Sequence, residues 1–267
     1  MKYTQIQPVK KLQPYIRYFG LLESEGSCKQ TTTFKIIADA NPGLIFQEKS
    51  NSFSDINNEK LPQLYLHGLT SSNSQKTVTG DYCNLVVCLQ TNAIKSIFGM
   101  DADELTDSYV QLNDIVKNNL ALQLLEEKRL NKRITIISDF LSRLILKNKY
   151  RENAQASYAV TNLNINNDDG LHRIQSELNM TERTLQRMFK TNIGIPPKLY
   201  FRICRFQAAL DHVRSQEFTS LTQIAHQHSY ADQAHFIRDF RMFTGTTPKQ
   251  FLQQANEQVL NFPEWVS

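Results

Sequence analysis

The sequence predicts an α+β protein of two domains: a β-rich N-terminal domain, and an all-α C-terminal domain with two helix-turn-helix units. Two observations carry this prediction. The spacing of apolar residues changes from that of strands to that of helices near residue 118, and one short pattern near the C-terminus occurs twice. With 267 residues the chain is long enough for two cores, and its 40% hydrophobic and 21% charged residues are typical of a globular protein.

Residues 1 to about 112 contain short apolar or alternating runs bounded by turn-forming clusters. Such runs predict strands, and strands of this length fit a small cupin-like barrel or a sandwich. The expected strands are residues 34–38, 43–47, 63–67 and 83–90. We also expect helices at 12–18 and at 92–98, the second ending at Gly99.

From about 118 to 148 the apolar residues fall at helical spacings and predict two amphipathic helices with a break near Asn131. The apolar face of residues 134–146 is expected to be core, and a dimer seam is the alternative. These helices should complete a sensor or dimerisation domain of residues 1–150. The boundary is expected between Lys149 and Asp168, where the polar stretch 157–170 has room for a short helix before a loop.

The first copy of the repeat predicts a helix-turn-helix unit at about 171–190. Leu171, Ile174 and Leu178 form the apolar face of a short helix, and a tight turn follows. Thr181 suits the N-cap of a second helix, because its hydroxyl can accept an orphan amide of the first turn. On that second helix, at 100° per residue, Leu185, Met188 and Phe189 share one side, whereas the other side holds Arg183, Thr184, Gln186, Arg187 and Lys190.

The second copy, at about 221–242, follows the same plan. A short helix with Ile224 and Ala225 precedes a turn, and Asp232 is the expected N-cap. A connecting helix of about 196–214 begins at two prolines and would span roughly 27 Å at ~1.5 Å per residue, close to one turn of B-DNA at about 34 Å. The outer face of the second copy offers Gln233, Ala234, His235 and Arg238.

Charge supports DNA as the partner of the repeat. The whole chain has a net charge of +4, while the segment 171–254 holds 11 Lys/Arg against 6 Asp/Glu. Arginine can donate two parallel hydrogen bonds to guanine and glutamine can pair with adenine, whereas lysines and helix N-termini bind phosphates. We therefore expect double-stranded DNA as a partner, read by two helices in successive segments of the major groove.

Residues of about 157–255 resemble the C-terminal domain of the AraC/XylS transcriptional regulators. The resemblance is carried by the runs 178–190 and 232–248, by Arg202, Arg205 and Leu210 on the connecting helix, and by Ile224-Ala225. It implies a DNA-binding domain at 155–255, followed by a tail at 256–267. Gln175 stands at a usual alanine and Ser229 at a usual glycine. The implied base contacts are Arg183, Gln186, Arg187, Gln233, Ala234, His235 and Arg238, and the expected phosphate contacts are Thr181, Thr184, Lys190, Lys198, Arg241 and Lys249.

The N-terminal part is similar to the β-rich sensor domains of a subgroup of the same regulators, through the segments 39–46 and 93–110. That similarity implies effector sensing or dimerisation and names no ligand. RNA polymerase, a small-molecule or protein effector and a second copy of the chain are further candidate partners. The sequence does not decide between activation and repression.

Other classes of protein are disfavoured. No apolar run reaches the length of a membrane span and the N-terminus lacks a secretory apolar core, so we expect a cytoplasmic protein. The four cysteines have neither disulfide nor zinc spacing, and His226 and His228 straddle a turn with no carboxylate or cysteine to complete a metal site. We expect no metal, no cofactor and no catalysis. The alternatives are a DNA-tethered methyl-acceptor enzyme and a ligand-sensing module without DNA activity.

Overall fold

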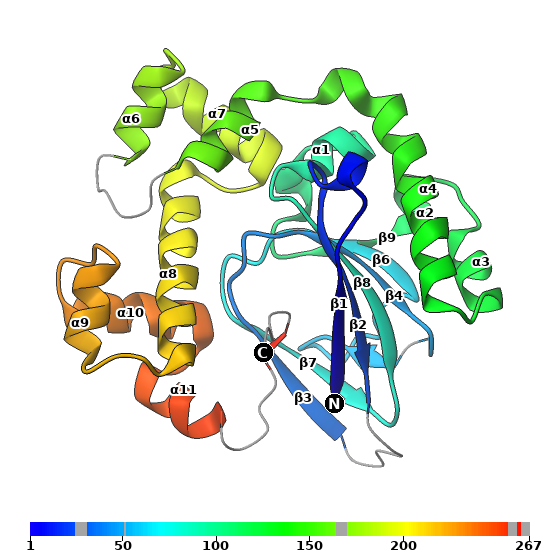
Figure 1. Ribbon diagram of the computed structural model, residues 1–267, viewed down its shortest axis with the longest axis horizontal. Coiled ribbons are helices and arrows are strands. Elements are labelled where there is room, and N and C mark those ends of the chain that lie inside the picture. The colour runs from blue at the N-terminus through cyan, green and yellow to red at the C-terminus, as the bar shows by residue number, and fades with distance from the viewer. Residues whose placement is uncertain (25–30, 51, 164–169, 256–260, 263–267) are drawn as a thin grey trace.

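The computed structural model describes residues 1–24, 31–50, 52–163, 170–255 and 261–262. The chain folds into a β-rich N-terminal domain and a helical C-terminal region, which lie side by side (Figure 1). Among the described residues, no helix combines the length and apolarity needed to cross a membrane.

Two sheets form the N-terminal domain. The six-stranded antiparallel sheet has the order β1-β2-β8-β4-β6-β9, and the four-stranded sheet has the order β10-β3-β7-β5. Side chains of both sheets, among them Phe34, Ile45 and Val86, form one apolar cluster between them. Over the residues that the structure describes, the domain is thus an open two-sheet structure and does not form a closed barrel. The strands are β1 Lys2–Ile6, β2 Ile16–Glu23, β3 Thr31–Ile36, β4 Gly43–Gln47, β5 Phe53–Ser54, β6 Leu64–His67, β7 Ser74–Thr79, β8 Cys83–Leu89, β9 Tyr109–Gln111 and β10 Asn261–Phe262.

The larger sheet is covered on its second face by helices. All five residues of β4 are buried, which accounts for its apolar run from Leu44 to Phe46. Leu44 and Phe46 of β4 share a core with side chains of the covering helices, such as Ile97 and Leu141. These elements are α1 Ala93–Phe98, η2 Ala102–Leu105, α2 Leu112–Ile115, α3 Leu120–Glu126 and α4 Leu130–Asn148. As expected, α1 ends at Gly99, whose φ of 77° is left-handed.

The prediction of a helix at 12–18 is wrong. Only a single 3-10 turn, η1 (Lys10–Leu12), forms there, and β2 begins at Ile16. Ile16 and Phe19 face the core under the helices while Leu22 faces the other sheet, so β2 is buried on both sides. A strand buried on both sides shows no alternation, and its apolar spacing can imitate that of a short helix.

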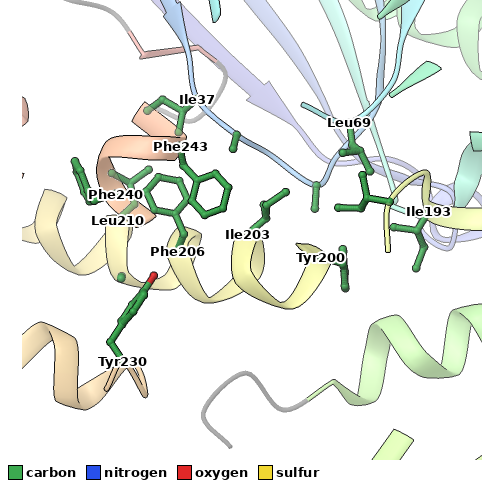
Figure 2. Packing of buried hydrophobic residues seen from close by; sticks show 14 of the residues in the cluster. Ile37, Leu69, Ile193, Tyr200, Ile203, Phe206, Leu210, Tyr230, Phe240 and Phe243 are labelled. Carbon is green, nitrogen blue, oxygen red and sulfur yellow. The ribbon is translucent and has the colours of Figure 1, made fainter. Parts of the chain in front are cut away.

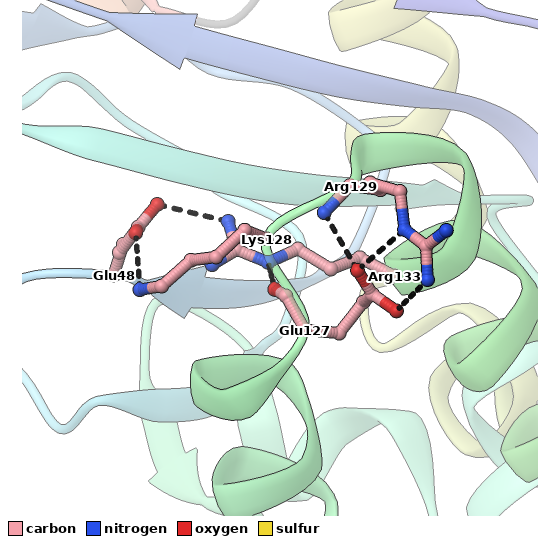
Figure 3. Close-up of polar contacts among 5 residues, drawn as sticks. All are labelled: Glu48, Glu127, Lys128, Arg129 and Arg133. Atoms are coloured by element: carbon pink, nitrogen blue, oxygen red, sulfur yellow. Dashed lines mark hydrogen bonds and ion pairs between the residues drawn. The ribbon is translucent and has the colours of Figure 1, made fainter.

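The break between the two helices, expected near Asn131, lies at 127–129. Arg133 of α4 is buried and donates from Nε to the carbonyl of Glu127, and from Nη1 to Glu48 Oε2 at 2.8 Å (Figure 3). Lys128 Nζ lies 3.2 Å from the other oxygen of Glu48. The hydrogen bond from Arg133 lowers the pKa of Glu48 to about 2. This contact connects the turn between α3 and α4 to the end of β4.

The C-terminal helices are α5 Ala154–Asn162, α6 Gly170–Glu177, α7 Glu182–Ile193, α8 Pro197–Ser215, α9 Leu221–Gln227, α10 Gln233–Thr244 and α11 Pro248–Ala255. The helix expected at the start of 157–170 is α5, while the expected loop at 164–169 lies outside the described residues. Of the expected tail at 256–267 the structure describes only β10, which pairs in parallel with β3 of the N-terminal domain.

The two parts of the chain share one apolar core around α8. Ile37 and Leu69 of the N-terminal domain belong to the same cluster as Ile193, Phe206 and Phe243. Figure 2 shows Ile37 beside Phe243 over the middle of α8, and Leu69 on the side of Ile193 near its start. Burial of this apolar surface holds the helical region against the sheets.

Candidate nucleic-acid interface

The two repeat copies form two helices of equal length with the same ends. α7 and α10 each have 12 residues. Thr181 caps α7 by accepting a hydrogen bond from the Thr184 amide, and Asp232 caps α10 by accepting one from the His235 amide. Gly194 and Gly245 follow the last turns with φ of 104° and 77°. The N-caps expected from the sequence are therefore confirmed.

The inner faces of α7 and α10 are also as expected. Leu185 and Phe189 of α7 are buried, as are the equivalent Phe236 and Phe240 of α10. The short helices α6 and α9 bury Ile174 and Ile224 in the same cluster. Each unit is thus a short helix, a turn and a capped helix packed through one apolar face, which is the geometry of a helix-turn-helix.

The opposite faces hold the residues expected to read bases. Arg187 and Arg238, which are equivalent in the repeat, are both exposed. His235 is half-buried, and its ring lies 5.2 Å from that of Tyr230 at 90°. The remaining members of the expected set are exposed, namely Arg183, Gln186, Gln233 and Ala234.

Some of these polar groups have partners within the protein. Gln186 Nε2 donates to Glu182 Oε1 at 3.1 Å along α7, and Gln233 Oε1 accepts from Thr222 Oγ1 at 2.8 Å. Contact with a base edge requires that these hydrogen bonds be exchanged for bonds to the base. Because they are exposed, water can replace either partner, and the exchange costs little.

The expected phosphate contacts divide into three groups. Lys198, Arg241 and Lys249 are exposed, and the two lysines occupy the first turns of α8 and α11 directly after Pro197 and Pro248. The hydroxyls of Thr181 and Thr184 are 2.9 Å apart at the N-terminus of α7. Lys190 is exposed as well, but its Nζ lies 3.5 Å from Asp103 of η2 in the N-terminal domain.

A buried acid fixes α10, and it was not expected from the sequence. Asp239 of α10 is buried and lies 2.7 Å from Arg202 and 3.5 Å from Arg205, both on α8. The Arg205 guanidinium stacks 4.3 Å from the Tyr230 ring and donates to the carbonyl of Ser229. Met188 stands at the equivalent position of α7. A charged residue on the otherwise apolar face of α10 was the available signal.

The two departures from the family pattern have structural consequences. Ser229 adopts φ of 54°, a left-handed conformation that glycine adopts without strain. Gln175 is half-buried in α6 where the second copy has the fully buried Ala225. Neither residue lies on the exposed faces of α7 and α10.

Comparison with known proteins accords with this geometry. Residues 174–254 match the family model described as a helix-turn-helix domain. The C-terminal domain is an AraC-type helix-turn-helix domain. Residues 4–111 match a second model, described as a domain of unknown function (DUF6597). No curated protein sequence matches this chain.

Several solved structures are similar to this chain. ToxT from Vibrio cholerae O395, bound to (E)-4-(8-methylnaphthalen-1-yl)but-3-enoic acid, is 13% identical over 95% of this chain and 99% of its own, with a TM-score of 0.49. Unsaturated fatty acid bound ToxT from Vibrio cholerae strain SCE256 is 16% identical over 87% and 94%, with a TM-score of 0.47. The C-terminal domain of the response regulator yesN from Fusobacterium nucleatum is 26% identical over 36% and 92%, with a TM-score of 0.32.

Outside the AraC-type domain, the N-terminal domain contains two adjoining hollows that share Ile36, His67, Thr70 and Lys76. The outer hollow has a volume of about 360 Å³ and a lining that includes Asn73 and Asp107, and the inner one has a volume of about 40 Å³. Burial lowers the pKa of His67 to about 4 and that of Lys76 to about 8. The His67 Nδ1 lies 2.9 Å from the Gly68 carbonyl.

The described cysteines are poor candidates for a methyl acceptor. Cys83, Cys88 and Cys204 are free thiols, and Cys28 lies outside the described residues. Burial raises the pKa of Cys83 to about 12 and that of Cys204 to about 11, so both stay protonated and weakly nucleophilic at neutral pH. In the part of the chain that the structure describes, no three His, Cys, Asp or Glu side chains are grouped so that they could hold a metal ion.

Proposed function

We propose that this protein is a transcription regulator that binds a specific DNA sequence with α7 and α10 in two successive segments of the major groove. The observation that carries the proposal is the pair Arg187 and Arg238: equivalent in the repeat, exposed, and borne by two helices with the same length and the same caps. An exposed arginine on a helix that enters the major groove can donate two hydrogen bonds to one guanine.

The connecting helix supports the use of both units on one face of the duplex. α8 has 19 residues and, at ~1.5 Å per residue, a length of roughly 28 Å, which approaches the pitch of B-DNA at about 34 Å. Lys198 and Lys249, at the starts of α8 and α11, are proposed to hold phosphates beside each reading helix together with Thr181, Thr184, Lys190 and Arg241. Arg183, Gln186, Gln233, Ala234 and His235 complete the proposed base-reading set.

We further propose that a small effector binds in the N-terminal domain at His67 and Lys76 and controls DNA binding in the cytoplasm. The Lys76 ammonium at the junction of the two hollows favours a ligand with an anionic group. A panel of small carboxylates should raise the melting temperature of the wild type, whereas Lys76→Met should abolish the rise. A second copy of the chain and RNA polymerase are proposed partners of the DNA-bound form.

The DNA proposal is tested by selection of binding duplexes from a random library with the full-length protein. We expect two conserved elements whose centres are about ten base pairs apart. Arg187→Ala and Arg238→Ala should each weaken binding by ~1–3 kcal/mol and relax the preference at one base pair in one element only. Lys147→Ala, which removes an exposed charge from α4, is the control.

Two outcomes would contradict the proposal. If the wild type enriches no sequence, the protein is a sensing module without DNA activity. If both arginine variants lose affinity for all duplexes equally, the two side chains contact phosphates and do not read bases.

A further inference from the structure

The N-terminal domain touches the C-terminal end of both reading helices. Thr106, at the end of η2, donates from Oγ1 to the carbonyl of Gly194 at 2.8 Å, just after α7. Asn73, in the turn before β7, donates from Nδ2 to the carbonyl of Met242 at 2.9 Å, in the last turn of α10. One polar side chain of the N-terminal domain therefore binds the last turn or the C-cap of each reading helix.

The contacts are close at the two glycines that are equivalent in the repeat. A Cβ on Gly194 would lie 2.6 Å from Thr106 Oγ1 and 3.0 Å from the carbonyl oxygen of Ala102. A Cβ on Gly245 would lie 2.9 Å from Asn73 Oδ1. Glycine at these positions thus adopts the left-handed conformation of the cap, and its lack of a Cβ leaves room for a side chain of the N-terminal domain.

The two loops that carry these side chains are joined to each other. Asp107, next to Thr106, accepts a hydrogen bond of 2.6 Å from the Ser71 amide and a second from the Ser71 hydroxyl. The Asp107 amide donates to the carbonyl of Leu69 at 3.0 Å. The loop that binds α7 and the loop that binds α10 therefore behave as one connected unit.

A third segment, residues 37–39, joins these loops and contacts the end of α10. Asp39 and Thr70 exchange two backbone hydrogen bonds of 2.8 and 2.9 Å, and the amide of Ala38 donates to the carbonyl of Phe243 at 3.1 Å. Gln207 of α8 donates to the carbonyl of Ala38. Leu69 and Ile37 pack in the apolar cluster on the sides of Ile193 and Phe243 (Figure 2).

We propose that Thr106 and Asn73 are positioning residues that set the separation and relative rotation of α7 and α10, and so fix the spacing between the two DNA elements that the protein accepts. The inference rests on the proposed function. The helix α8 connects the two helix-turn-helix units covalently. The joined loops that carry Thr106 and Asn73 connect the C-terminal ends of α7 and α10 through the N-terminal domain. Each added base pair rotates one DNA element relative to the other by about a tenth of a turn. If the relative rotation of α7 and α10 is fixed, both helices can enter the major groove only at one number of base pairs between the elements.

The two joined loops also border the outer hollow of the N-terminal domain. Asn73 and Asp107 both line that hollow. The residues that position the reading helices are thus shared with the proposed effector site.

The test uses the full-length protein and the duplex recovered by selection. The number of base pairs between its two elements is changed by −1, +1 and +2, and affinities are measured for the wild type, Thr106→Val, Asn73→Ala and the double variant. We expect the wild type to prefer its own spacing roughly tenfold, because each misplaced contact typically weakens binding by that order. The double variant should reduce the preference to about threefold or less, since each hydrogen bond is worth roughly fivefold.

Two controls keep the test specific. Asn131→Ala and Thr135→Val remove the same groups from exposed positions of the N-terminal domain and should leave the spacing preference unchanged. A duplex with a single element should bind the double variant as tightly as it binds the wild type, which shows that each unit is still folded.

The inference is overturned if the double variant binds a single element normally and keeps the full spacing preference. If the wild type selects no duplex, the proposed function fails instead. The positioning role is then still measurable by hydrogen exchange, where the amides of Gly194 and Gly245 should exchange faster in the double variant than in the wild type. Unchanged exchange at both amides would overturn the inference in that case.

Discussion

The carboxylate of Asp239 in α10 accepts a hydrogen bond of 2.7 Å from the guanidinium of Arg202 in α8. Arg205, one turn further along α8, is almost fully buried and has the same carboxylate as its ionic partner at 3.5 Å. The helix α10 is thereby held to the connecting helix α8 by charge, whereas α7 has Met188 at the equivalent position.

Asp239→Ala should destabilise the C-terminal domain by about 3–5 kcal/mol, because it leaves the buried Arg205 charge without its ionic partner. Urea unfolding followed by far-ultraviolet circular dichroism measures the loss. Asp211→Ala is the matched control, since the pair Asp211–Arg214 is 3.8 Å apart with Asp211 exposed, and it should cost less than about 1 kcal/mol. Equal losses in the two variants would contradict a structural role for the Asp239 pair.

Lys198→Ala and Lys249→Ala should weaken DNA binding equally for all sequences. Each should reduce the slope of the logarithm of affinity against the logarithm of salt concentration by about 1, because one phosphate contact is lost. Filter binding of the selected duplex and of a scrambled duplex at several salt concentrations measures both effects. A slope that does not change would place these lysines outside the interface.

The Glu48 carboxylate should make stability depend on pH in the acid range. Its pKa is lowered to about 2 by the hydrogen bond from Arg133, while the unfolded value is near 4.5. The unfolded state therefore binds more protons between these values, so the contribution is complete above about pH 4.5 and is lost as the pH falls toward 2.

Glu48→Gln should accordingly be less stable than the wild type by about 2 kcal/mol at pH 7, and the difference should shrink as the pH falls below about 4. Thermal unfolding from pH 7 to pH 3 measures the difference. Glu59→Gln, at an exposed position of the same domain, should have the same stability as the wild type from pH 7 to pH 3. A constant difference for Glu48→Gln would rule out the linkage.

Ser229→Gly should stabilise the protein by about 1 kcal/mol. Ser229 has φ of 54°, and a residue with a Cβ is strained there, while the carbonyl that accepts from Arg205 remains in the variant. Ser176→Gly, in the exposed face of α6, should have the opposite sign because glycine lowers helix stability. Denaturant midpoints of the two variants against the wild type decide the matter, and a loss of stability in Ser229→Gly would contradict the prediction.

Sequence patterns predicted most of α7 and α10 because the determinants of these helices are local. The caps at Thr181 and Asp232 and the buried Phe189 and Phe240 each depend on residues within about four positions of one another. The N-terminal domain was harder to predict. The polar strand β7 has a single buried residue, Val78, and β2 is buried on both faces, so neither shows the alternation that identifies a strand.

The sequence by itself determined that two similar capped helices would form, each with a buried apolar face and an exposed face that carries an arginine. Tertiary structure alone decided what those helices contact: Asp239 with the arginines of α8, and Thr106 with the carbonyl of Gly194, 88 residues away. The physical reason is that caps and amphipathic faces are set by neighbours along the chain. Which polar side chain meets a given helix end, however, depends on how the two parts of the chain bury their apolar surfaces against each other.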